Sequence, residues 1–196
     1  MKDIRVLVDM DGVICDLIRH ACGKFPYAGD WRDVYANWPR NNYDVHCVFD
    51  KTTPAEFWNA LDRKFWATMP KTKHADWLIN HLETIGYDYG FLSTPSSNPE
   101  SASGKIEWIE KNYPEMRKRF LLGAAKDYCA NGNSILIDDY TLNCISFEEA
   151  GGRAIIFPQP WNILNSCVKQ TRSGIKNALE RITNDICKTR RAKTSI

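Results

Sequence analysis

Two carboxylates lie one residue apart at the end of an apolar run near the N-terminus, in residues 6–16, VLVDMDGVICD. Three apolar residues in a row predict a buried strand, and Gly12 permits a tight turn directly after it. Asp9 and Asp11 therefore fall where the strand ends, a place where carboxylates are costly unless a cation meets them. The stretch is the first candidate for chemistry.

Two further predicted strands also end in polar side chains. Residues 87–92, YDYGFL, are followed by Ser93 and Thr94, and residues 134–140, SILIDDY, end in Asp138 and Asp139. In open α/β sheets, ligands bind beyond the carboxyl ends of the strands. We therefore expect the three polar strand ends to converge on one site.

Four carboxylates in one cleft would repel one another. Mg²⁺ resolves this repulsion, since it takes oxygen ligands and keeps waters and positions for a phosphate substrate. The absence of a His or Cys cluster argues against zinc. The expected cofactor is Mg²⁺, and the expected metal-binding residues are Asp9, Asp11, Asp138 and Asp139.

This arrangement suits phosphoryl transfer. An ionised Asp9 can attack phosphorus and form an aspartyl-phosphate. Asp11 can protonate the departing alkoxide and then activate water for the second step. A hydroxyl of Ser93 or Thr94, together with a lysine, can hold the phosphoryl oxygens and offset their charge.

The elements that must position these residues alternate along the chain. Strands are expected at residues 4–9, 87–92, 119–122, 134–140 and 153–157. Helices are expected at residues 14–24, 74–85, 100–112 and 141–150, and from about 163 to the end. This alternation predicts an α/β fold with a mainly parallel sheet.

Residues 30–70 have a different pattern, dense in aromatic side chains with polar residues and prolines between them. Within this segment the stretch TTPAEFWNALDRKFW starts a helix, with Thr52 or Thr53 as the N-cap and Pro54 in the first turn.

The strand ending in DxDGV, the strand ending in Thr, the lysine and the strand ending in IDD together resemble the haloacid dehalogenase (HAD) superfamily of phosphohydrolases. More narrowly, VLVDMDGVICDL and ILIDDY are similar to the 5′(3′)-deoxyribonucleotidases. The resemblance implies a Rossmann-like core of residues 1–15 and 73–196. It also implies a small helical cap of residues 16–72, inserted after the first strand.

The same resemblance implies roles for single residues. Asp9 would be the nucleophile and a metal ligand, and Asp11 would be the general acid/base and bind Mg²⁺ through its backbone carbonyl. Thr94 would bind phosphate. Asp138 and Asp139 would complete the metal site, and which of the two touches the ion directly is left open.

The phosphate-binding lysine has two candidates. Lys126 lies twelve residues before Asp138, a spacing close to that of the deoxyribonucleotidases, whereas Lys105 lies on a predicted helix. We prefer Lys126 and keep Lys105 as the alternative.

Cap aromatic side chains suit a nucleobase, because every base offers a face for stacking. Trp58 resembles a cap tryptophan of the deoxyribonucleotidases, and Trp38 is a second candidate. Those enzymes carry phenylalanine where this chain has Leu17, so the contact to the base changes at that position.

We therefore expect a phosphatase for nucleoside monophosphates, with deoxyribonucleotides preferred. Two alternatives stay open. One is a phosphatase of the same superfamily that acts on polynucleotide 3′ ends or another phosphorylated metabolite. The other is a non-catalytic nucleotide-binding domain.

The composition of the chain indicates in which compartment the protein works and which partners it binds. The seven cysteines form no CxxC pair, which favours reduced thiols and a cytoplasmic protein. No apolar run approaches the roughly 18 residues of a membrane span.

The net charge is +2, and the last ten residues, CKTRRAKTSI, hold four basic side chains and no acid. The body of the chain is therefore not expected to bind nucleic acid, and the expected partner is a small-molecule nucleotide. A homodimer is left open.

Overall fold

The computed structural model describes residues 3–194, and of residues 190–194 it describes the backbone alone. Most of the basic side chains of the C-terminal tail therefore lie outside the described part. Within the described part, no helix has the length and apolar character needed to cross a membrane.

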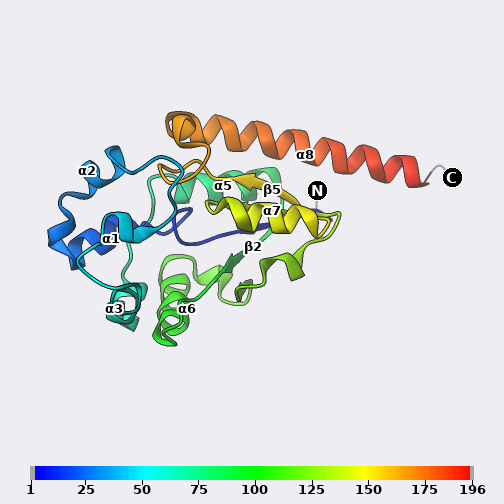
Figure 1. Cartoon of the computed structure of the whole chain (residues 1–196). Helices are drawn as coiled ribbons and strands as arrows, with labels where there is room; N and C mark the ends of the chain where they lie inside the picture. Colours follow the sequence, from blue (N-terminus) through cyan, green and yellow to red (C-terminus); the bar gives the residue numbers. More distant parts are fainter. Residues whose placement is uncertain (1–2, 195–196) are drawn as a thin grey trace.

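The fold is an α/β fold built on one five-stranded parallel sheet (Figure 1). The strand order is β3-β2-β1-β4-β5, and every neighbouring pair is parallel. The strands are β1 (Arg5–Val8), β2 (Asp88–Ser93), β3 (Phe120–Leu122), β4 (Ser134–Asp138) and β5 (Arg153–Ile156). This confirms the predicted fold class, with β1 at the centre of the sheet.

The helices follow the predicted alternation. The α-helices are α1 (Leu17–Lys24), α2 (Trp31–Ala36), α3 (Pro54–Ala60), α4 (Arg63–Ala67), α5 (Ala75–Ile85), α6 (Glu100–Asn112), α7 (Thr141–Glu149) and α8 (Thr171–Thr194). Short 3-10 helices are η1 (Pro26–Ala28), η2 (Val45–Cys47), η3 (Pro114–Met116), η4 (Lys126–Cys129) and η5 (Asn165–Gln170). Five α-helices, α1 to α5, lie between β1 and β2, so a helical segment follows the first strand as expected.

The two faces of the sheet carry separate apolar clusters, because successive strand residues point to opposite faces. On β1, Val6 and Val8 belong to the larger cluster, which also holds buried residues of α5 and α8. Leu7 points to the other face and packs with Phe147 of α7. The central strand is therefore covered on both sides, as a parallel sheet requires.

The stretch TTPAEFWNALDRKFW holds two helices. Thr53 caps α3 and forms a capping box with Glu56. The helix stops at Leu61, and the side chain of Asp62 accepts a hydrogen bond from the backbone N–H of Phe65, which begins α4. The side chain of Asp62 thus starts a second helix by satisfying a first-turn donor.

Helices α4 and α6 pack against each other at Gly104. A Cβ atom at Gly104 would lie 2.5 Å from the carbonyl oxygen of Arg63 and 2.5 Å from the Cβ atom of Trp66. Neither atom can swing away, because both belong to the backbone or lie next to it. Glycine at this position therefore sets the distance between α4 and α6.

We predict that Gly104→Ala lowers the free energy of unfolding by about 1–3 kcal/mol, the usual cost of overpacking. Gly174→Ala is the matched control, because its added Cβ would lie in open space on the helix α8. There alanine should stabilise by about 0.4–1 kcal/mol. Urea unfolding midpoints, compared at an unchanged slope, measure both. Equal midpoints for the two variants would contradict this account of the α4–α6 contact.

Candidate active site

The turn after β1 places Asp9 and Asp11 at the centre of the sheet edge. The backbone N–H groups of Val13, Ile14 and Cys15 all donate to the carbonyl oxygen of Met10, at 3.2, 2.9 and 2.7 Å. Gly12 within this turn has φ +76°, a conformation that L side chains rarely adopt.

Gly12 is also required for space. A Cβ atom at this position would collide with the carboxylate of Asp139. The turn after β1 therefore lies directly against the end of β4, and two of the predicted polar strand ends meet.

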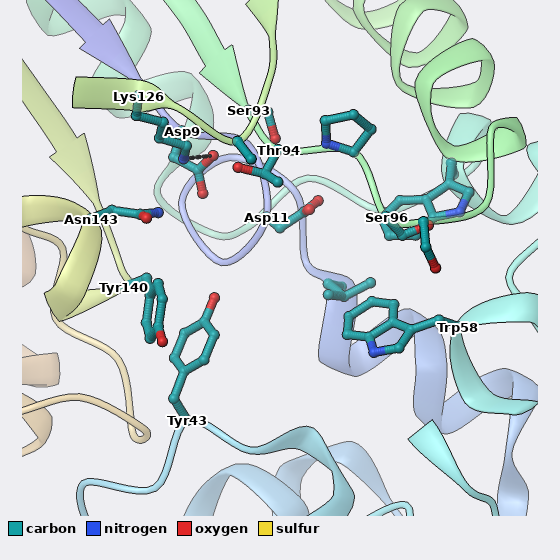
Figure 2. A pocket seen from close by; sticks show the side chains of 15 residues that line it. Asp9, Asp11, Tyr43, Trp58, Ser93, Thr94, Ser96, Lys126, Tyr140 and Asn143 are labelled. Carbon is teal, nitrogen blue, oxygen red and sulfur yellow. Dashed lines mark hydrogen bonds and ion pairs between the residues drawn. The ribbon is translucent and has the colours of Figure 1, made fainter. Parts of the chain in front are cut away.

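Lys126, in η4 after β3, joins two strand ends through ion pairs. Its Nζ atom donates to Asp9 Oδ1 at 2.7 Å (Figure 2). The same atom donates to Asp138 Oδ2 at 2.6 Å. All three side chains are buried. Burial lowers the pKa of Lys126, but the charges of Asp9 and Asp138 outweigh this effect and raise the pKa above its usual value. The lysine therefore carries its charge inside the site.

Lys105, on α6, forms a second buried centre. Its Nζ atom donates to Asp11 Oδ2 at 2.6 Å, to Ser93 Oγ at 2.9 Å and to the carbonyl oxygen of Thr94 at 2.7 Å. The side chain is fully buried. The structure thus brings both candidate lysines to the site, but the three donors of Lys105 already have three acceptors.

The carboxylates of Asp9, Asp138 and Asp139 lie close enough to share one cation. One oxygen from each lies within 4.8 Å of the others. Asp139 Oδ1 is buried and has no hydrogen-bond partner among the described residues. A buried carboxylate oxygen without a partner is what a metal ion would satisfy, so these three residues fit a divalent cation.

The local electrostatics favour the same conclusion. Burial and then the charge of Asp9 raise the pKa of Asp138 to about 6. Burial, followed by the charges of Asp138 and Asp9, raises the pKa of Asp139 well above its usual value. Each buried carboxylate thus disfavours ionisation of its neighbours, and a bound cation would remove that penalty.

The segment after β5 holds Asp139 in place. Trp161 donates from Nε1 to Asp139 Oδ2 at 2.7 Å, and Asn162 Nδ2 donates to the carbonyl oxygen of Asp139 at 2.9 Å. Gln159 donates from Nε2 to the carbonyl oxygen of Gly12. Residues 159–162 therefore fix both strand ends that form the carboxylate cluster.

A cavity of about 450 Å³ opens above these groups, and Asp9, Asp11, Thr94 and Lys126 line it (Figure 2). Burial raises the pKa of Asp11 despite the nearby charge of Lys105. The cavity thus presents a carboxylate, a second carboxyl that takes up a proton more readily than usual, a hydroxyl and an ammonium.

Aromatic side chains form the mouth of the cavity. Tyr43 and Tyr140 stack on one side with ring centroids 3.9 Å apart, and Trp58 lies across from them (Figure 2). Leu17 also lines the cavity. The structure therefore brings two of the three predicted substrate-binding residues, Leu17 and Trp58, to the cavity that holds Asp9.

Trp38 is not brought into this cavity. Its side chain is 6 % exposed, its Nε1 atom donates to the carbonyl oxygen of Asn42, and its ring packs on Trp161 at 5.2 Å between centroids. Trp38 therefore supports the side chain that holds Asp139, and it lines a small neighbouring cavity with Asp11 and Leu17 instead of the cavity above Asp9.

Several lining residues were missed by the sequence analysis. Tyr43, Ser96, Tyr140 and Asn143 all line the cavity, and Asn143 Nδ2 donates to Asp138 Oδ2 at 3.1 Å. Tyr140 and Asn143 follow the IDD motif directly, so their proximity to it was a usable signal. Tyr43 lies in a loop far from every motif, and the sequence carries no comparable signal for it.

No protein-family model matches the chain, and no curated protein matches its sequence. Solved structures do match. YfnB of Bacillus subtilis, described as a HAD hydrolase and bound to magnesium, is 14 % identical with a TM-score of 0.52, over 80 % of this chain and 87 % of that one. A hydrolase from Streptococcus pneumoniae TIGR4 is 13 % identical with a TM-score of 0.50, over 85 % and 97 %.

At such low identity the likeness concerns the fold. The match spans most of this chain, and its parallel sheet with a helical segment after β1 agrees with the resemblance of the motifs. The chain therefore has the fold of the HAD superfamily hydrolases.

Proposed function

We propose that the chain is a Mg²⁺-dependent phosphatase that hydrolyses nucleoside monophosphates through an aspartyl-phosphate on Asp9. The observation that carries the proposal is the position of Asp9. It lines the cavity, pairs with Lys126 at 2.7 Å and shares the carboxylate cluster with Asp138 and Asp139. The HAD fold, and the magnesium bound to YfnB, support the choice of reaction and metal.

Asp9, Asp138 and Asp139 would hold the ion, with the backbone carbonyl of Asp11 as a further ligand implied by the family resemblance. When bound, Mg²⁺ supplies positive charge that neutralises the carboxylates and the phosphoryl oxygens. Trp161 and Asn162 act through Asp139, because they hold its carboxylate and its backbone.

The first step transfers the phosphoryl group to the protein. A carboxylate oxygen of Asp9 forms a bond to phosphorus while the bond from phosphorus to the leaving oxygen breaks. Asp11 gives its proton to that oxygen, and the raised pKa of its buried carboxyl suits this role. The nucleoside leaves with its hydroxyl group restored.

The second step releases phosphate. Asp11, now ionised, takes a proton from a water molecule, whose oxygen attacks phosphorus. The bond from phosphorus to the Asp9 oxygen breaks, so the carboxylate returns to its starting state. Lys126 holds the phosphoryl oxygens in both steps because it lines the cavity, whereas Lys105 is fully buried and positions Asp11.

Residues 16–72 would act as the cap that excludes water and contacts the nucleoside. A second cavity of about 560 Å³ adjoins the first and shares Leu17, Tyr43 and Trp58 with it. The phosphate would lie over Asp9, and the base and sugar would extend toward this aromatic wall. The family resemblance favours deoxyribonucleotides among the nucleoside monophosphates.

We predict that Asp9→Asn lowers turnover by at least about a thousandfold, because the amide cannot form the aspartyl-phosphate. Phosphate release is measured with Mg²⁺ on deoxy- and ribonucleoside monophosphates carrying 5′ or 3′ phosphate. Asp185→Asn, on the exposed side of α8, is the matched control and should keep wild-type turnover. An Asp9→Asn variant that turns over like the wild type would reject the mechanism.

Trp161→Phe tests the metal site separately from turnover. The variant keeps an aromatic ring but loses the N–H that orients Asp139, so Mg²⁺ affinity should fall about 10- to 100-fold. Calorimetric titration with Mg²⁺ measures this without substrate. Trp77→Phe, on α5, is the matched control and should bind Mg²⁺ like the wild type. An unchanged Mg²⁺ affinity in Trp161→Phe would show that the indole N–H does not contribute to metal binding.

Trp58 is expected to stack on the nucleobase. Trp58→Ala should raise KM about tenfold for a deoxynucleoside monophosphate, in keeping with about 1–3 kcal/mol for one stacked base. KM for glycerol phosphate, which has no ring to stack, should change little. Trp58→Phe should restore most of the nucleotide affinity. Equal changes in KM for the two substrates would exclude Trp58 from base binding.

A further inference from the structure

A separate groove, larger than any cavity described above, lies outside the proposed active site. It has a volume of about 880 Å³ and is formed by residues of α1 and α2, the loop before α5 and the segment between β5 and α8. The start of α8 lies on the same side of the molecule as α2 (Figure 1). The groove shares no lining residue with the cavity above Asp9.

The groove is strongly basic. Six of its lining residues are basic and one, Asp16, is acidic. The basic residues are Arg19, Arg32, Arg40, Lys71, Lys73 and Lys169. The whole chain has a net charge of only +2, so positive charge is concentrated here.

Part of this charge is neutralised locally, because Arg32 pairs with Asp30 at 3.3 Å and Lys71 pairs with Asp76 at 2.7 Å. Asp16 is buried, and its carboxylate accepts hydrogen bonds from the Tyr35 hydroxyl at 2.6 Å and from the backbone N–H of Arg19. Arg40 and Lys169 are exposed, and no carboxylate within residues 3–189 forms an ion pair with them. These two side chains can therefore meet anions from solution.

Trp31 adds an aromatic wall to the groove. The guanidinium carbons of Arg19 and Arg32 lie 5.0 and 4.6 Å from the centre of its ring. Trp31 is only partly buried, and a base that stacks on its ring would take the place of one of these two exposed guanidinium groups. A stacking surface beside several cationic side chains is the combination that binds unpaired bases along with their phosphates.

We infer that this groove binds single-stranded nucleic acid. The row of cations matches a phosphate backbone, and Trp31 offers a face to one base. A duplex fits less well, because its bases are stacked on each other and present no free face to Trp31. The groove is a separate cavity from the one above Asp9, and Trp38 in its wall packs on Trp161, which holds Asp139.

Fluorescence anisotropy with a labelled single strand of about 12 nucleotides, with hydroxyl groups at both ends, tests the proposal on the full chain. Arg40→Glu/Lys169→Glu should weaken binding at least about tenfold at low salt. The slope of log affinity against log salt should become shallower by about 1.4, because about 0.7 is lost per phosphate contact. Trp31→Ala should weaken binding about tenfold, and Trp31→Phe should retain most of it.

The matched control is Lys111→Glu/Lys118→Glu, which changes net charge by the same amount at exposed positions outside the groove. Its affinity should stay close to that of the wild type, and melting temperatures should show that all variants fold. Equal losses in the two double variants, or no binding by the wild type at low salt, would overturn the proposal. Equally tight binding of a duplex, or of a single nucleoside triphosphate, would also overturn it.

Discussion

The burial of three carboxylates around one small volume is the constraint on which the rest of the structure depends. Asp9, Asp138 and Asp139 are almost fully shielded from water, and Lys126 pairs with two of them. Removing such charges from water costs several kcal/mol per ion, roughly, unless each finds a partner. The parallel sheet provides the solution, because it brings the end of β1, the segment after β3 and the end of β4 to one edge.

The segment after β5 also stabilises the carboxylate cluster, through hydrogen bonds to the loops that carry it. Trp161, Asn162 and Gln159 hold the loops after β4 and β1, and the groups to which they bind are buried. A hydrogen bond to a buried ionised group contributes more than one at the surface, and its loss leaves an unsatisfied charge. The cluster is thus built from the ends of the strands and is kept rigid by a segment that carries none of the reacting groups.

The sheet and the residues at its edge could be predicted because the signal for each lies within a few neighbouring residues. An apolar run followed by Asp9 or Asp138 is visible in the sequence, and parallel topology brings such ends together. Tyr43 and Trp38 could not be assigned in this way. The sequence of the segment that holds them has no hydrophobic periodicity. Whether each ring faces the cavity or the core depends on contacts with Tyr140 and Trp161, nearly a hundred or more residues away.

The expectation that the body of the chain does not bind nucleic acid rests on net charge, which does not show how charge is distributed over the surface. A value of +2 averages over the whole surface, whereas a ligand responds to the potential within about a Debye length, roughly 8–10 Å. Folding brings Arg19, Arg40, Lys73 and Lys169 into one groove, while Asp9, Asp138 and Asp139 are buried in the carboxylate cluster. This separation of charge by the fold, which composition does not reveal, is the basis of the proposal that the groove binds a polyanion.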